Sequence, residues 1–329
     1  MLDPLMQGFL TDVGWGAATA TPLAGDASSR RYVRLKHQHQ SAILMDAGPN
    51  SGEDLTRFAM IAHHLRGLSL SAPNVLAQAD DRFLLLEDLG DRVFASEILA
   101  APRSEISLYQ TALDALSIVQ DNPPPQKLPP YGPSEMGAAT DLAFIWYAPD
   151  LQPHKAELTA RLADLLKTHL AGPLVMCLRD FHAENLIWLP ERNGAAQAGL
   201  LDFQDAVLCH PAYDIASLLI DARRDVSVEA RENLISYAAN KSGQTAQRLA
   251  LQIALCSAQR NLRILGIFAR LASRDNKPHY ADLLPRVWSN FVSDLSNPIL
   301  SPIRNELLKR LPSPTPAYIA ALKDRHVSN

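Results

Sequence analysis

The alternation of apolar and polar residues predicts a small antiparallel sheet near the start of the chain. Residues 31–35 alternate between the two kinds, and residues 42–45 form a compact apolar run after a polar turn. This arrangement is typical of two strands joined as a hairpin. Residues 75–77 and 83–86 repeat it around Asp80-Asp81, so we expect a second hairpin in the same sheet.

A helix is predicted between the two hairpins. Apolar residues recur there at helical spacing: Leu55, Phe58, Ala62 and Leu65. Ser51, followed three residues later by Asp54, is a variant of the capping box that opens helices. We expect this helix to pack on the sheet.

Helical periodicity dominates the rest of the chain. We expect a helix near residues 93–119, then a stiff loop at 121–133, where six prolines remove backbone donors. From about residue 212 onward the pattern is almost wholly helical. The sequence therefore predicts an α+β fold of two lobes, with a small antiparallel sheet in residues 1–88 and a larger, mostly helical lobe in residues 89–329.

Composition and charge narrow the class of protein. Apolar residues make up 47% of the 329 residues, as in soluble globular proteins, and 31 basic against 35 acidic residues leave a net charge of −4. Such a balance offers no positive field to a polyanion, so nucleic acid is not an expected partner.

The location expected for the protein is the cytoplasm. No apolar run reaches membrane-spanning length, and the first basic residue is Arg30, which argues against an export signal. The three scattered cysteines, Cys177, Cys209 and Cys256, suit a reducing compartment and are expected in the core. We expect no membrane attachment, and no obligate protein partner is evident.

The most informative stretch follows the apolar run 174–177. It reads Asp180-Phe181-His182-Ala183-Glu184-Asn185 and places an acid and an amide five positions apart in a polar loop. Residues 186–189 and 199–201 are predicted to pair as a hairpin around the turn signal Asn193-Gly194. That hairpin would return Asp202 to the side of Asn185.

Asn185 and Asp202 suit a magnesium ion, because Mg²⁺ prefers hard oxygen ligands and often takes only one or two of them from the protein. Asp180 lies too few residues before Asn185 to be far from such an ion. Its carboxylate could meet a hydroxyl beside a metal-bound phosphate, so Asp180 is the candidate catalytic base.

Three ordered motifs within 35 residues resemble the aminoglycoside phosphotransferase family of small-molecule kinases. They are Asp180-x-His182-x-x-Asn185, Leu201-Asp202-Phe203-Gln204-Asp205 and Pro211-x-x-Asp214. Segments over most of the chain are also similar to a bacterial group within that family, the N-acetylmuramate/N-acetylglucosamine anomeric kinases: residues 25–32, 85–91 and 266–271.

The resemblance implies a protein-kinase-like fold that binds ATP and Mg²⁺, with Asp180 as base and Asn185 and Asp202 on the metal. It also implies that residues 25–29 lie over the phosphates and that residues 87–89 present backbone groups to adenine. The expected ATP-binding residues are Gly25, Ser28, Ser29, Arg34, Ile43, Glu87 and Leu89.

The chain lacks the strand lysine with which protein kinases hold the α- and β-phosphates, since the matching run ends in Leu44-Met45. We hypothesise that Arg34 or Arg31 supplies this charge, because a guanidinium can bind phosphate bidentately. Leu178 stands where many relatives carry a histidine. An inactive nucleotide-binding protein on a kinase-like fold is therefore an alternative.

The expected acceptor is the anomeric hydroxyl of N-acetylmuramate or N-acetylglucosamine, on the resemblance alone. Asp205 and His182 are candidate substrate contacts, although His182 could instead shape its loop, and Asp214 is expected to be a cap or a loop brace. An aminoglycoside or another small alcohol is the alternative acceptor. The rival enzyme class is a two-metal phosphoesterase that would use five residues: Asp180, His182, Asp202, Asp205 and His210.

Overall fold

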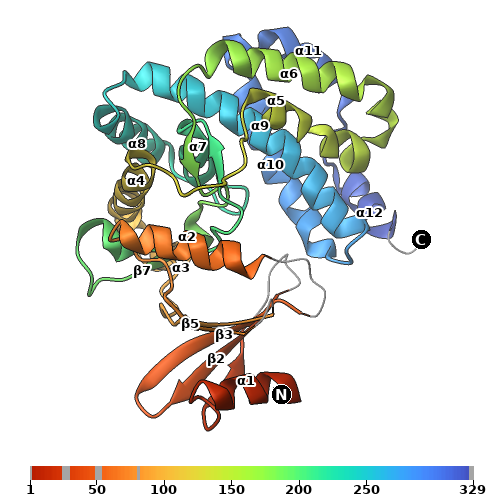
Figure 1. The fold of residues 1–329 in the computed structure, drawn as a ribbon. Coiled ribbons are helices and arrows are strands. Elements are labelled where there is room, and N and C mark those ends of the chain that lie inside the picture. Colours follow the sequence, from red (N-terminus) through yellow and green to blue (C-terminus); the bar gives the residue numbers. More distant parts are fainter. Residues whose placement is uncertain (1, 24–29, 49–53, 80–81, 326–329) are drawn as a thin grey trace. The chain divides into compact units, whose positions relative to one another are not determined.

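A computed structural model describes residues 2–23, 30–48, 54–79 and 82–325 (Figure 1). The chain forms two compact units, each of them discontinuous in sequence. The first comprises Met1–Ser104 with Glu184–Asp205, and the second comprises Glu105–Ala183 with Ala206–Asn329. The lobe boundary predicted at residue 88 stays a prediction.

The first unit is built on a five-stranded antiparallel sheet with the order β1-β2-β3-β5-β4. Its strands are β1 (Thr19–Pro22), β2 (Arg31–His37), β3 (Gln40–Asp46), β4 (Val75–Ala79) and β5 (Phe83–Glu87). Both predicted hairpins are confirmed, because β2 pairs with β3 and β4 pairs with β5. Sequence patterning missed β1, whose four residues are all exposed and carry no apolar alternation.

Helix α1 (Pro4–Asp12) covers one face of this sheet. Its Met6, Phe9 and Leu10 share one core with alternate residues of three strands: Val33, Leu35, Ala42, Leu44, Phe83 and Leu85. The spacing of two along each strand is the pleat that points every second side chain to the same face. Helix α2 (Leu55–Gly67) lies on the opposite side of the sheet (Figure 1).

The start of α2 differs from the predicted capping box. Asp54 is itself the N-cap, and its Oδ1 accepts a hydrogen bond from the Arg57 backbone N–H at 2.9 Å. A side-chain acceptor at this position satisfies one of the helix's unpaired donors. Ser51, the predicted cap, lies outside the described residues.

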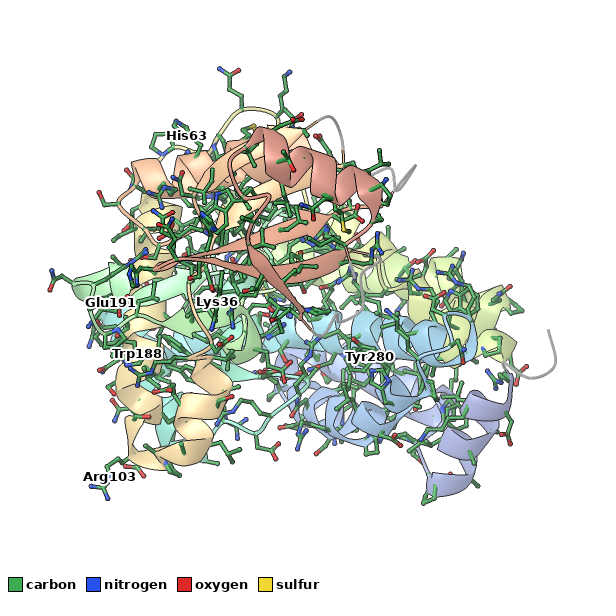
Figure 2. The ribbon with its side chains drawn as sticks, turned by 90° about the horizontal axis from the view of Figure 1, so that it is seen from below. Lys36, His63, Arg103, Trp188, Glu191 and Tyr280 are labelled. Carbon is green, nitrogen blue, oxygen red and sulfur yellow. The ribbon has the colours of Figure 1, made fainter. Side chains whose placement is uncertain are left out.

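A third hairpin, β7 (Leu186–Trp188) with β8 (Ala198–Leu200), joins the first unit from far along the sequence. Isolated bridges connect Gly199 with Ser71 and Ile187 with Val93. The ring of Trp188, which is labelled in Figure 2, also packs edge-on against Phe94 of α3 (Phe94–Ala100), with ring centroids 6.1 Å apart. The predicted hairpin is therefore confirmed and is fixed to the region around residues 71–94.

The prediction of a single helix near residues 93–119 is wrong. The chain instead forms α3, a 3₁₀ turn at Pro102–Ser104, and α4 (Glu105–Asp121). Pro102 explains the break, since proline lacks a backbone N–H and disfavours helical geometry in the residue before it.

The second unit is mostly helical, as predicted. Besides α4 it contains α5 (Pro133–Ala138), α6 (Lys155–His169), α7 (Ala212–Leu219), α8 (Val228–Lys241), α9 (Ala246–Ser273), α10 (Leu284–Leu295), α11 (Ser301–Arg310) and α12 (Pro316–Asp324), and a short pair of strands, β6 (Val175–Cys177) with β9 (Val207–Cys209). Its three cysteines are buried and free, which confirms their predicted place in the core. None of the helices in the described ranges combines the length and apolar character needed to cross a membrane.

Helix α9 closely approaches the short π-helix at Ala143–Tyr147. A Cβ atom at Gly266 would lie 2.2 Å from the Leu142 carbonyl carbon and 2.4 Å from the Ala143 nitrogen. Both obstacles are backbone atoms, so no side-chain rotation could relieve the clash. The glycine is needed because it lets two backbones touch.

We predict that Gly266→Ala lowers the melting temperature by roughly 3–10 °C. Overpacking costs about 1–3 kcal/mol, and each kcal/mol shifts the melting point of a domain of this size by about 2–4 °C. Thermal unfolding followed by circular dichroism measures the change. Gly8→Ala in α1 is the matched control, because its Cβ would meet nothing within 4 Å. Equal melting temperatures for the two variants would contradict the close approach.

Candidate active site

Asn185 and Asp202 lie side by side in the first unit. The hairpin pairs Leu186 with Leu200, and the Leu201 N–H donates to the Asn185 carbonyl at 3.0 Å. The pairing thus extends one residue beyond the two strands, and just there Asn185 Nδ2 is 3.4 Å from Asp202 Oδ2. The structure brings the two residues together as the hairpin predicted, while their role as metal ligands stays a prediction.

Polar groups surround the Asp202 carboxylate. Its Oδ1 accepts a hydrogen bond from Gln204 Nε2 at 2.6 Å and lies 3.7 Å from Arg30 Nη1. The Arg30 side chain is only 8% exposed, whereas that of Asp202 is 45% exposed. Asp202 has a φ of +55°, in the left-handed region that side chains disfavour. Such strain persists only where the surroundings hold the residue, and it gathers at functional sites.

Helix α2 holds the segment that follows Asp202. Arg57 Nε donates to the Gln204 carbonyl at 2.8 Å, and the rings of Phe58 and Phe203 have centroids 4.9 Å apart. Sequence reasoning missed Arg57 and Arg30 at this site. A local signal existed only for Arg30, which directly follows the segment expected over the phosphates.

Asp180 belongs to a loop of the second unit that Asp214 braces. The two Asp214 carboxylate oxygens accept hydrogen bonds from the backbone N–H groups of Leu178 and Arg179, at 2.5 and 2.9 Å. Burial raises the pKa of Asp214 to about 6, although these two donors lower it. The loop-brace prediction is confirmed, and the cap prediction is wrong because Pro211 is the N-cap of α7.

The backbone before Asp180 is also strained and tightly held. Arg179 has a φ of +71°, and its carbonyl accepts hydrogen bonds from Arg260 Nη1 at 3.0 Å and Ser217 Oγ at 3.4 Å. Burial lowers the pKa of Arg260, but Tyr213 and the carboxylates of Asp180 and Asp214 outweigh it and raise that pKa. A buried cation therefore lies within electrostatic reach of Asp180.

The other candidate substrate and metal residues have different surroundings. His182 is buried, with its Nε2 3.1 Å from Arg223 Nη1, and Asp205 is exposed. His210 Nδ1 accepts the Ala212 N–H at 3.2 Å, and burial lowers the pKa of His210 to about 4. Within the described ranges, no three His, Cys, Asp or Glu side chains form a metal-binding group.

The arginines proposed to replace the strand lysine both have acidic partners. Arg34 Nε lies 2.8 Å from Asp88, and its Nη1 lies 2.5 Å from Asp91. Arg31 Nη2 lies 2.5 Å from Asp46 and 3.4 Å from Asp3.

The remaining ATP-binding candidates are spread over the first unit. Ile43 is half-buried between Arg34 and Leu86 in the sheet, and Leu89 packs in a small core with Ile187. Gly25, Ser28 and Ser29 lie outside the described residues.

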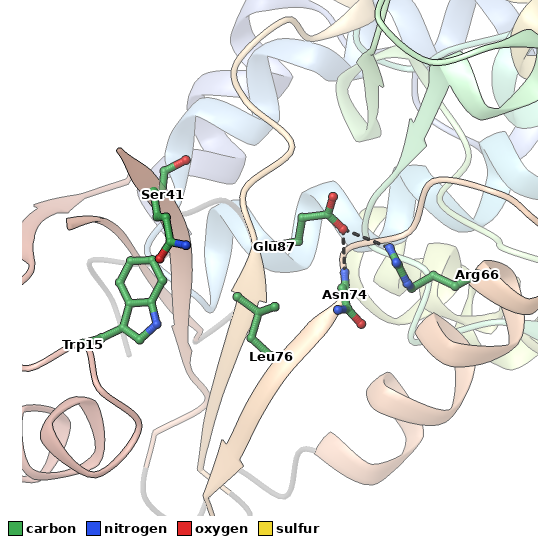
Figure 3. Close-up of a pocket in the computed structure, with 7 residues that line it drawn as sticks. Trp15, Ser41, Arg66, Asn74, Leu76 and Glu87 are labelled. Carbon is green, nitrogen blue, oxygen red and sulfur yellow. Dashed lines mark hydrogen bonds and ion pairs between the residues drawn. The ribbon is translucent and has the colours of Figure 1, made fainter. Parts of the chain in front are cut away.

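The side chain of Glu87 accepts three hydrogen bonds. It accepts hydrogen bonds from the Asn74 N–H and Arg66 Nη1, both at 3.0 Å, and from Arg192 Nη2 at 2.6 Å. It also lines a pocket of the first unit with Trp15, Gln40, Ser41, Arg66, Asn74 and Leu76 (Figure 3). Its side chain braces the end of β5, and the expected backbone contact to adenine stays a prediction.

Comparison with known proteins defines the class of protein. Residues 19–251 match the family described as the phosphotransferase enzyme family. The chain belongs to this family, as the motifs predicted, and it is a kinase-like phosphotransferase that acts on small molecules.

Individual relatives are similar along nearly the whole chain. The chain is 37% identical to an N-acetylmuramate/N-acetylglucosamine kinase of Caulobacter vibrioides, over 90% of this chain and 93% of the relative. It is 31% identical to the protein of the same name from Pseudomonas aeruginosa, over 94% and 95%. The fold resembles a choline/ethanolamine kinase family protein of Mesorhizobium loti, with a TM-score of 0.63, 14% identity and coverage of 98% and 95%. The predicted kinase-like fold is confirmed.

We predict that Asp214→Asn reduces turnover about tenfold to a hundredfold. The amide offers one acceptor oxygen where two backbone donors need partners, and a lost buried hydrogen bond costs about 1–3 kcal/mol. Steady-state kinetics measure the change, with circular dichroism to verify folding. Asp282→Asn is the matched control, because Asp282 is exposed and pairs with Lys323. Wild-type turnover in Asp214→Asn would contradict the brace.

The raised pKa of Asp214 predicts that the same variant changes how the free energy of unfolding depends on pH. The native carboxyl keeps its proton to about pH 6, whereas in the unfolded chain it ionises near 3.8. The free energy of unfolding of the wild type should therefore fall, relative to Asp214→Asn, as the pH rises from about 4 to about 6. Urea unfolding at several pH values measures this difference, and parallel curves would contradict it.

Proposed function

We propose that the protein transfers the γ-phosphate of ATP to the anomeric hydroxyl of an N-acetylated amino sugar, N-acetylmuramate or N-acetylglucosamine, with Mg²⁺ as cofactor. The names of the relatives from Caulobacter and Pseudomonas support this acceptor. The observation that carries the proposal is the adjacency of Asn185 and Asp202; Asn185 follows the braced Asp180 by five residues.

The side chains of Asn185 and Asp202 fit a magnesium ion. A carboxylate and an amide carbonyl are hard oxygen ligands, and waters and phosphates usually complete the shell of Mg²⁺. Asn185 directs its Nδ2 at Asp202, and a half-turn about its last bond would direct its carbonyl oxygen there instead. The ion, when bound, would neutralise charge on the phosphate oxygens.

Asp180 is the proposed catalytic base. Its carboxylate would accept the proton of the sugar hydroxyl while the hydroxyl oxygen forms a bond to the γ-phosphorus and the bond to ADP breaks. The hydrogen bonds on both sides of Arg179 support this role, because they fix the backbone that carries Asp180.

Three buried free thiols and the use of ATP support the proposed cytoplasmic location.

A coupled assay of ADP release over amino sugars, aminoglycosides and amino alcohols tests the proposal. We expect turnover with the N-acetylated amino sugars and a loss of roughly 10²–10⁴-fold in Asp180→Asn, the usual contribution of a general base. Asp164→Asn, an exposed carboxylate of α6, is the control that should keep full activity. Turnover only with aminoglycosides or amino alcohols would overturn the acceptor. Stabilisation by ATP with no turnover would favour the inactive nucleotide-binding alternative.

Arginine variants test which cation replaces the missing strand lysine. All three arginines lie beside carboxylates, but the carboxylate beside Arg30 is that of the proposed metal ligand Asp202, whereas Arg34 and Arg31 lie beside Asp88 and Asp46. We expect Arg30→Met to raise the KM for ATP about tenfold or more, because charge-assisted hydrogen bonds contribute roughly 1.5–3 kcal/mol. Arg30→Lys should recover part of the loss.

The control is Arg92→Met, since Arg92 is half-exposed and pairs with Glu97. Arg34→Met and Arg31→Met test the sequence-based hypothesis in the same assay. A rise in the KM for ATP in either of them, with Arg30→Met unchanged, would return the role to that residue.

A further inference from the structure

An arginine from the loop between α7 and α8 contacts the segment that carries Asp180. Arg223 Nη1 lies 3.1 Å from Nε2 of His182, a buried residue two positions after Asp180. A guanidinium has only donors, so Nε2 of His182 is the acceptor in this contact. The imidazole therefore holds the guanidinium in place within the second unit.

The backbone on both sides of Arg223 is also fixed. Its N–H donates to Asp221 Oδ1 at 2.8 Å, and its carbonyl accepts a hydrogen bond from Arg286 Nη1 of α10 at 2.8 Å. Asn290 Nδ2, also from α10, donates to the Asp221 carbonyl at 3.3 Å. A group fixed in this way loses little conformational freedom on binding a ligand.

The neighbouring arginine has a different environment, which separates the two side chains. Arg224 Nη2 donates to Glu105 at 2.9 Å and its Nη1 to the Tyr109 hydroxyl at 2.5 Å, both on α4. These contacts give Arg224 a structural role between α4 and the loop. Arg223 is directed instead at the segment of the proposed catalytic base.

We propose that Arg223, positioned by His182, binds a carboxylate of the acceptor sugar; this rests on the proposed function. A guanidinium binds a carboxylate through two parallel hydrogen bonds. N-acetylmuramate carries a carboxylate on its lactyl ether at C3, and N-acetylglucosamine has a hydroxyl there. Arg223 therefore favours the acidic sugar without taking part in phosphoryl transfer.

The chain separation is compatible with one sugar reaching both groups. The Cα atoms of Asp180 and His182 are at most about 7 Å apart, and Arg223 contacts His182. This length is comparable with a pyranose ring and its first substituents. The anomeric hydroxyl on C1 and the lactyl group on C3 stand on carbons separated by one ring atom. A sugar with its C1 hydroxyl at Asp180 could thus direct its carboxylate toward Arg223.

Kinetics with both sugars test this subsite. We expect Arg223→Met to lower kcat/KM for N-acetylmuramate about 10- to 100-fold, mainly through KM, and to change that for N-acetylglucosamine less than about threefold, since a hydrogen bond to a charged group contributes roughly 1.5–3 kcal/mol. Arg223→Lys should retain part of the preference. Arg248→Met, an exposed arginine at the start of α9, should leave both sugars unchanged.

The wild-type enzyme supplies a test that does not depend on a variant's folding. The methyl ester of N-acetylmuramate should lose the advantage of the free acid in the wild type and show no such loss in Arg223→Met. Equal losses for both sugars, or a selectivity unchanged by Arg223→Met, would overturn the subsite and leave the proposed function intact. A wild type that phosphorylates neither sugar would overturn the proposed function itself.

Discussion

The register of one short hairpin determines where the chemistry-bearing side chains of the first unit lie. Because Leu186 pairs with Leu200, Asn185, one residue before the pair, and Asp202, two residues after it, come within 3.4 Å although seventeen positions separate them. A slip of one residue would turn the side chains of one strand to the other face and separate the two. The bridge between Gly199 and Ser71 resists that slip by joining the hairpin to the rest of the unit.

Both segments proposed for catalysis depend on strained backbone that polar side chains hold in place. Arg179 and Asp202 each have a positive φ, which costs of order 1–3 kcal/mol for a residue other than glycine. In the second unit, Asp214 and Arg260 satisfy backbone groups on either side of the strained Arg179 peptide. In the first unit, Arg57 holds the carbonyl of Gln204. Rigid placement of this kind is what phosphoryl transfer requires, because positioning supplies most of its catalysis.

The sequence carried enough local signal for the fold class, the three hairpins and the adjacency of Asn185 and Asp202. Period-two patterning and the Asn193-Gly194 turn are local properties, and each strand pair was correct for that reason. Arg57 at Gln204 and Arg223 at His182 could not be predicted, because 147 and 41 positions separate the partners and many arginines are chemically equivalent. The motifs indicated the class of acceptor through their resemblance to a family, but they carried no signal for these long-range contacts.

In the proposed mechanism, Asn185 and Asp202 bind the same divalent cation. A crystal structure with Mn²⁺ and a non-hydrolysable ATP analogue, with the ion located by its anomalous scattering, tests it most directly. We expect one ion within roughly 2.0–2.6 Å of an oxygen of each side chain and of the phosphates. An ion bound to the phosphates but not to these two side chains, or two ions with one residue on each, would contradict it.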